Sequence, residues 1–181
     1  MENLTVYPEN DRLALGFAFR RLRSEGLRGS TLARQAFSCC GGCGVSEISG
    51  MPGVVAWVFF TKQQLDSFDR NGNIHECQQL PLVWGLGKAH RAWKDEDPDH
   101  AAAMTEWGNK IVAALKSVGL SVEWDGTESM TILVSHKSTR RMLTVYVNSE
   151  KDAAAVSGLL EAMKQSVSSL DYDTTWEEVS E

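Results

Sequence analysis

The sequence predicts an α+β fold: a single domain in which helices pack on a mixed or antiparallel sheet of about five strands. Residues 54–60 form a continuous run of β-branched and aromatic residues, which is typical of a central strand buried on both faces. Residues 98–118 place apolar side chains along one helical face, which favours an amphipathic helix. The contents of 43% hydrophobic and 23% charged residues are those of a globular protein.

Length and charge predict one domain with an acidic end. Domains usually span about 100–200 residues, so the 181 residues are expected to form a single domain over residues 1–169. Residues 170–181 are then an acidic C-terminal tail without Lys or Arg. Such a tail predicts binding to an unidentified protein partner of basic character.

Nucleic-acid and membrane binding are disfavoured. The net charge of −6 does not provide the broad basic surface that phosphate binding needs. No segment approaches the ~20 apolar residues of a membrane span, and the N-terminus lacks the features of a secretion signal. We therefore expect a cytoplasmic protein with reduced thiols. A local run of arginines lies on the first predicted helix and on the segment that follows it, and these side chains are expected to be exposed to solvent. The run comprises Arg20, Arg21, Arg23, Arg28 and Arg34.

In the first half of the chain, residues 11–25 carry apolar side chains at helical spacing. Asn10 or Asp11 can cap this helix and Gly26 can end it. Residues 27–36 are expected to be a connection or a short second helix. After the buried strand, residues 61–68 predict a short helix capped by Thr61. Residues 79–84 predict another strand, which its proline places at a sheet edge or near the start of the strand.

In the second half, Asp97 and Pro98 are expected to cap and begin the clearest helix, which Gly119 closes. Three strands are then expected to form an antiparallel meander, over residues 120–124, 130–134 and 142–147. A last helix is predicted over residues 153–167 and is expected to pack on the sheet.

Cysteines and glycines are concentrated in residues 37–44, which hold three of the four cysteines. The spacing Cys40-Gly-Gly-Cys43 is shared by thiol oxidoreductases and metal sites. In redox chemistry, Cys40 would be the nucleophile and Cys43 the resolving thiol. Such a nucleophile needs a strand followed by a helix N-terminus, and residues 34–37 match that strand poorly.

A zinc site is the second interpretation of these cysteines. Structural zinc usually has four sulfur or imidazole ligands, often as two close pairs. Cys40 and Cys43 supply one pair, His75 and Cys77 could supply the other, and Cys39 is a spare ligand. The third interpretation, which we prefer on the sequence alone, is that the cysteines are small buried apolar residues and that the glycines allow a tight backbone path.

Two other polar features predict no site. Residues 69–73 begin like a calcium loop but lack the glycine and glutamate that complete one, so a turn is expected. The remaining histidines, His90, His100 and His136, have no recognisable catalytic partner nearby in the sequence and are expected at the surface or in loops.

The motif Phe37-Ser-Cys-Cys-x-x-Cys43, residues 55–60 followed by Gln63, and the later motif Val122-Glu-Trp-Asp-Gly126 together resemble a bacterial family of domains of unknown function, over about residues 12–135. The resemblance implies that these residues form a domain, and it implies no catalytic activity because the family has no established one. Members of the family tend to have a His after the strand and an Asp just after the Gln, where this chain has Thr61, Lys62 and Gln64. If those positions are metal ligands in the family, this chain has lost them.

The sequence thus predicts a small cytoplasmic binding or structural-interaction protein built around a cysteine-glycine cluster. A thiol-disulfide oxidoreductase and a zinc-stabilised module are the alternatives. Zinc is the one cofactor that the cluster suggests.

Overall fold

The computed structural model describes residues 2–6, 8–27, 29–136 and 143–147. It divides the chain into two compact units, Met1–Val6 with Thr144–Glu181, and Tyr7–Leu143. In the first unit, β1 (Glu2–Val6) and β7 (Leu143–Val147) form a two-stranded sheet. The predicted last helix and acidic tail lie outside the described residues, so the division into a domain over 1–169 and a tail stays a prediction.

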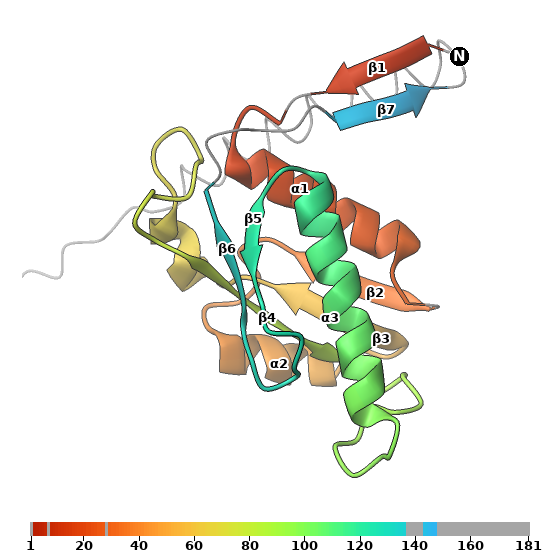
Figure 1. Cartoon of the computed structure of the whole chain (residues 1–181). Helices are drawn as coiled ribbons and strands as arrows, with labels where there is room; N and C mark the ends of the chain where they lie inside the picture. The colour runs from red at the N-terminus through yellow and green to blue at the C-terminus, as the bar shows by residue number, and fades with distance from the viewer. Residues whose placement is uncertain (1, 7, 28, 137–142, 148–181) are drawn as a thin grey trace, which may run out of the picture. The chain divides into compact units, whose positions relative to one another are not determined.

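The second unit contains a five-stranded mixed sheet with helices on both faces, which confirms the predicted α+β class (Figure 1). The strand order is β2-β3-β4-β6-β5, with β2 parallel to β3 and the other pairs antiparallel. The elements in chain order are α1 (Asp11–Glu25), β2 (Ser30–Arg34), α2 (Gly41–Ser49), β3 (Val54–Phe59), the 3-10 helix η1 (Lys62–Ser67), β4 (Leu80–Leu86), α3 (His100–Ser117), β5 (Ser121–Glu123) and β6 (Ile132–Ser135).

Strand β3 is buried along its whole length, as its apolar run predicts. Ala56 and Val58 belong to the core beneath α1 and α3, while Trp57 and Phe59 belong to the smaller core beneath α2. The alternation follows from the two-residue period of a strand. Helices α1 and α3 pack together on one face, and α2 lies on the other (Figure 1).

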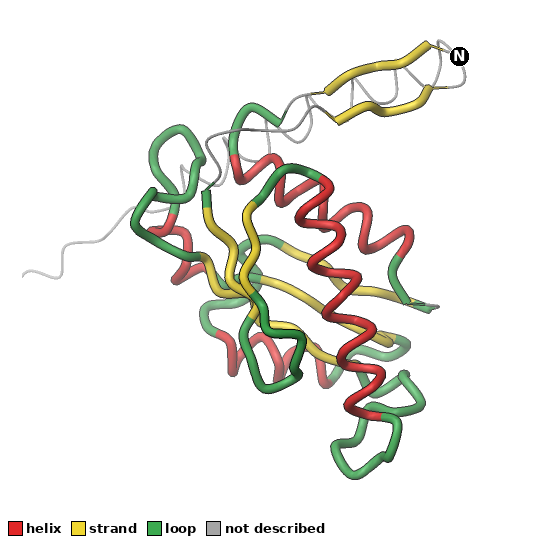
Figure 2. The backbone as a smooth tube through the Cα atoms, in the orientation of Figure 1, coloured by secondary structure: helices red, strands yellow, loops and turns green. Residues whose placement is uncertain are grey.

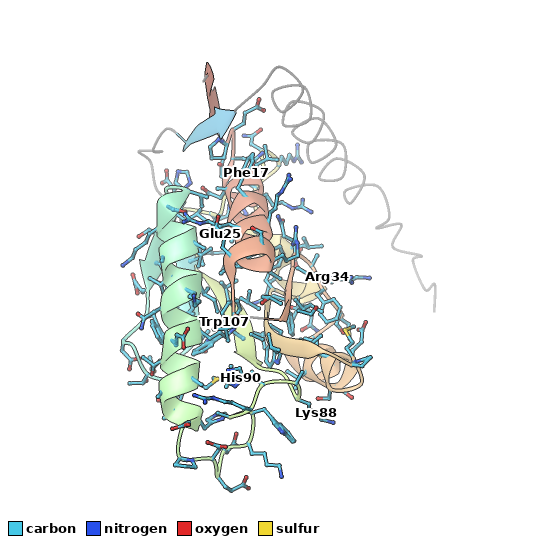
Figure 3. All side chains as sticks on the ribbon, turned by 90° about the vertical axis from the view of Figure 1, so that its right-hand side faces the viewer. Phe17, Glu25, Arg34, Lys88, His90 and Trp107 are labelled. Atoms are coloured by element: carbon cyan, nitrogen blue, oxygen red, sulfur yellow. The ribbon has the colours of Figure 1, made fainter. Side chains whose placement is uncertain are left out.

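Helix α3 is fixed to the centre of the sheet by Trp107, which is fully buried. Its indole Nε1 donates a hydrogen bond of 3.0 Å to the carbonyl of Trp57 in β3. Figure 3 shows this side chain between the helix and the sheet. The hydrogen bond satisfies the indole N–H in an apolar core, where an unpaired donor would cost about 1–3 kcal/mol.

Several predicted boundaries are confirmed. Helix α1 spans residues 11–25, Asn10 accepts the N–H of Leu13 at 2.8 Å, and Gly26 follows as the C-cap. Thr61 is the N-cap of η1, and residues 69–73 form a turn in which Asp69 accepts the N–H groups of Asn71 and Asn73.

Other predictions are wrong. The connection or helix at residues 27–36 contains strand β2, which has too few large apolar residues to show a strand pattern. Helix α3 begins at His100 with Asp99 as N-cap, because Asp97 instead accepts the N–H of Asp99 in the turn before it. For the proline of β4, the predicted alternative near the start of the strand is confirmed, since β4 begins at Leu80 and is an inner strand.

The predicted meander is also corrected. Strands β5 and β6 pair as expected, but the other neighbour of β6 is β4, and β7 pairs with β1. Turn signals and apolar runs locate strands; they do not specify which distant strand each one joins. Figure 2 shows that a long loop connects the end of β4 at Leu86 to α3.

Helix α2 was absent from the sequence prediction because its first turn is rich in glycine. Gly44 explains its close packing, since a Cβ there would lie 2.5 Å from Phe59 Cζ of β3. We expect Gly44→Ala to lower the free energy of unfolding by about 1–3 kcal/mol.

Gly42 in the same turn is the matched control, because a Cβ there meets nothing within 4 Å. Gly42→Ala should raise stability by up to ~1 kcal/mol, since alanine is the better helix former. Urea unfolding of both variants measures the difference. Equal effects of the two substitutions would contradict the packing of α2 through Gly44.

Candidate cysteine site

The cysteine site begins with a loop that connects β2 to α2 and is tied to the end of β3. Phe37 donates its N–H to the carbonyl of Phe60 at 2.8 Å, and Lys62 donates its N–H to the carbonyl of Ser38 at 3.0 Å. The ring of Phe37 is buried and meets Phe59 edge-on at 5.2 Å between centroids. These contacts fix the position from which α2 starts.

Two residues of this loop have left-handed backbone conformations that are unusual without glycine. Ala36 has φ 47° and Ser38 has φ 59°. Such conformations cost about 1–2 kcal/mol each, and the anchoring hydrogen bonds offset this cost. Backbone strain of this kind is common near functional sites.

Cys40 is the N-cap of α2. Its backbone is extended (φ −142°, ψ 171°), and its Sγ accepts the N–H of Cys43 at 3.5 Å. The carbonyl of Cys40 accepts the N–H of Gly44 at 3.0 Å. The first turn of a helix presents unpaired N–H groups and a partial positive charge, so this position favours a thiolate.

The three sulfur atoms of Cys39, Cys40 and Cys43 all lie within 4.8 Å of one another. The pKa of the Cys40 thiol is lowered, mainly by the N–H of Cys43 and then by hydrogen bonds from the thiols of Cys43 and Cys39. The pKa of Cys43 is raised to about 11, because its thiol is hydrogen-bonded to Cys39 and Cys40 and because negative charge on them repels a second one. The cluster therefore favours one thiolate, at Cys40, beside a protonated Cys43.

Our preferred interpretation of the cysteines as buried apolar residues is wrong. Cys39, Cys43 and Cys77 are exposed, Cys40 is half-buried, and all four thiols are free. Residues 35–37 are not part of a strand, as their poor match indicated, but strand β2 ends just before them at Arg34 and helix α2 begins directly after Cys40. A strand and a helix N-terminus therefore do flank the cysteine loop.

His75 and Cys77, which we predicted as further zinc ligands, are not part of the three-cysteine group. Both lie in the connection between η1 and β4, where His75 donates its N–H to the carbonyl of Ser67 at 3.0 Å. In the described part of the chain, the group therefore offers three sulfur ligands that could hold a metal ion.

A groove of about 310 Å³ lies along β4 and the segment before β6. Its walls include Gln64, Val83 and Met130, and 48% of the Met130 surface is exposed. Val83 also faces the start of α2, since a Cβ at Gly41 would lie 3.5 Å from Val83 Cγ2. This surface is called the β4 groove below, and its wall residue Val83 lies close to Gly41, the residue next to Cys40.

One histidine has a partner that the sequence did not reveal. His136 Nδ1 lies 2.7 Å from Asp11 Oδ2, and the same oxygen accepts the N–H of Ile74 at 2.9 Å. The carboxylate is buried and links the start of α1, the turn after η1 and the end of β6. No sequence signal connects residues 125 positions apart, so this pair could not be predicted.

A family model described as "Domain of unknown function (DUF6891)" matches residues 7–142. No curated protein and no solved structure matches the chain. Within the described residues, no helix has the length and apolar character needed to cross a membrane.

The N–H of Cys43 should control the reactivity of Cys40. In a variant that carries Cys39→Ser, Cys43→Ser and Cys77→Ser, alkylation of Cys40 by iodoacetamide should rise with pH around a midpoint below the ordinary thiol pKa of about 8.5. The reaction follows the thiolate, so a lowered pKa gives full reactivity at lower pH.

The matched control replaces Cys43 by proline in the same background, because proline lacks the N–H and is tolerated in the first turn of a helix. The midpoint should then move up towards the ordinary value. Circular dichroism checks that helix content is kept. Identical midpoints with Ser and Pro at position 43 would refute the role of this N–H.

Proposed function

The chain belongs to a family of domains of unknown function, and we propose from its own cysteine site that it catalyses thiol–disulfide exchange. The observation that carries this proposal is the position of Cys40 as N-cap of α2, with the N–H of Cys43 donated to its Sγ. A stabilised thiolate is the nucleophile that exchange needs. Cys43 provides a second thiol close enough to resolve the intermediate.

The reaction follows from the two different thiols. The Cys40 thiolate attacks one sulfur of a substrate disulfide, whose S–S bond breaks, and the departing sulfur takes up the electron pair and a proton. Cys43 then loses its proton and attacks Cys40 Sγ, which forms the Cys40–Cys43 disulfide and releases the second substrate thiol. The substrate gains two electrons, and an external thiol must reduce the new disulfide before the next cycle.

The exposure of the cluster supports this function. A disulfide must reach Cys40 within bonding distance, and both Cys39 and Cys43 are open to solvent. The β4 groove, whose wall residue Val83 lies close to Gly41, would give a substrate polypeptide room to bind near the nucleophile. Because exchange of this kind needs reduced thiols, we place the protein in the cytoplasm, where thiols are kept reduced.

A reductase assay with insulin and dithiothreitol tests the proposal. The protein should accelerate reduction, and Cys40→Ser should lower the rate by more than about tenfold, because a serine hydroxyl is not ionised at neutral pH. Cys77→Ser is the control and should keep the full rate. Circular dichroism verifies the fold of each variant.

The intermediate gives a second readout. With both Cys39 and Cys43 changed to Ser, no neighbouring thiol can resolve the mixed disulfide, so it should accumulate on Cys40 and appear by mass spectrometry. The proposal fails if the unmodified protein is no faster than dithiothreitol alone.

Metal binding is a second candidate function, favoured by the distances among the three sulfur atoms. Zinc–sulfur bonds of about 2.3 Å place tetrahedral sulfur ligands about 3.8 Å apart, so small movements of Cys39, Cys40 and Cys43 would suffice. With three protein ligands, the fourth position would hold water or an external ligand. Metal binding would be one form of the binding role that the sequence predicts. A protein partner for residues 170–181 stays a prediction.

Cys39 distinguishes the two candidates, since exchange requires only Cys40 and Cys43. If zinc is bound, calorimetric titration of the reduced protein should give one ion per chain, and Cys39→Ser should weaken binding by more than about tenfold. The same variant should retain the exchange rate in the insulin assay. Zinc binding that is unaffected by Cys39→Ser would argue against the three-sulfur site.

A further inference from the structure

A second open surface follows the outer edge of β2. This strand has β3 as its one neighbour in the five-stranded sheet, so its other edge is not paired within that sheet. A groove of about 510 Å³ runs along it and is lined by every residue of the strand. The remaining walls are Arg23 of α1 and residues 51, 52 and 54 after α2. We call this surface the β2 groove.

Three arginines gather at the β2 groove. Arg23 and Arg34 line it, and Arg20 lies on the same helix as Arg23. Burial and then repulsion from Arg20 and Arg34 lower the pKa of Arg23, so the three positive charges lie close together. In Figure 3, Arg34 lies on the side of the ribbon away from α3.

The described residues provide no carboxylate for these three arginines, in contrast to Arg21, which pairs with Glu25 at 2.8 Å. Arg23 donates to the carbonyl of Ala33 in β2, and Arg34 stacks over the ring of Phe37 at 5.6 Å. The guanidinium groups of Arg23 and Arg34 are thus held near the strand edge. An anionic partner there would relieve the repulsion that Arg23 shares with Arg20 and Arg34.

We propose that the β2 groove binds an extended acidic segment of a partner polypeptide, which adds as a strand along β2 and pairs its carboxylates with Arg20, Arg23 and Arg34. The carbonyl of Ala33 already accepts a hydrogen bond from Arg23, and the other main-chain groups at the unpaired edge of β2 are the donors and acceptors for such a segment. Carboxylates and guanidinium groups form strong charge-assisted hydrogen bonds.

The residues on the two walls of the β2 groove also predict the order of acidic and apolar residues in the partner segment. Arg23 contributes positive charge from α1, while Leu32, Met51 and Val54 contribute apolar surface. Side chains of an added strand alternate between two sides, so acidic residues should alternate with apolar ones. A nucleic acid has no peptide groups to pair with the main-chain edge and would not use the apolar wall.

The probe is a fluorescein-labelled peptide of alternating Glu and Val, about eight residues long to match a typical strand. Fluorescence anisotropy with the full-length reduced protein should show saturable binding. Arg20→Gln and Arg34→Gln should each weaken it by ~two- to fivefold, as expected for partly exposed charge pairs. Arg21→Gln changes the same charge on the same helix away from the groove and should leave binding unchanged.

Two further probes test the strand and the charge. A peptide of alternating Lys and Val, and a Glu–Val peptide with every backbone amide N-methylated, should both bind at least fivefold more weakly. The proposal is overturned if the Glu–Val peptide does not bind, if Arg20→Gln and Arg21→Gln act alike, if N-methylation has no effect, or if labelled single-stranded DNA binds as tightly as the peptide. None of these outcomes depends on the thiol chemistry of Cys40.

Discussion

The burial of β3 on both faces is the constraint on which the rest of this unit depends. One set of its side chains packs beneath α1 and α3, and the other set packs beneath α2. The same strand pairs with β2 on one side and β4 on the other. Where β3 ends, the carbonyl of Phe60 and the N–H of Lys62 hold the loop before Cys40. The strand that forms the core therefore also positions the cysteine site.

Elements that bury a long apolar pattern could be predicted from the sequence, whereas short or glycine-rich elements could not. Long apolar patterns revealed β3 and α1, because each shows its burial directly in its residue order. Strand β2 was missed because it is a short edge strand with the sequence Ser-Thr-Leu-Ala-Arg. Helix α2 was missed because three glycines stand in its first turn, where propensity argues against a helix and contact with Phe59 favours one.

The cysteine site shows the same limit. Its residues could be named from spacing alone, but their exposure and their difference in pKa depend on α2 beginning at Gly41. Without the helix, three adjacent thiols look equivalent, and burial is a reasonable expectation for cysteine. With it, Cys40 alone receives the N–H of Cys43. The position of α2, which the sequence did not predict, thus determines which thiol has the lowered pKa.

A single helix N-terminus favours one negative charge more readily than three. In the unliganded cluster, this produces one thiolate beside a thiol with a pKa of about 11, an asymmetry suited to exchange, in which the two thiols act in turn. A bound metal ion would instead favour three thiolates, since its positive charge lowers the pKa of every coordinating thiol. Cys39 distinguishes metal binding from exchange. Its sulfur lies within 4.8 Å of those of Cys40 and Cys43, but a two-thiol cycle does not need it. The third sulfur at this distance is therefore the feature that exchange alone does not explain, and it is the physical reason for proposing metal binding beside exchange for the same loop.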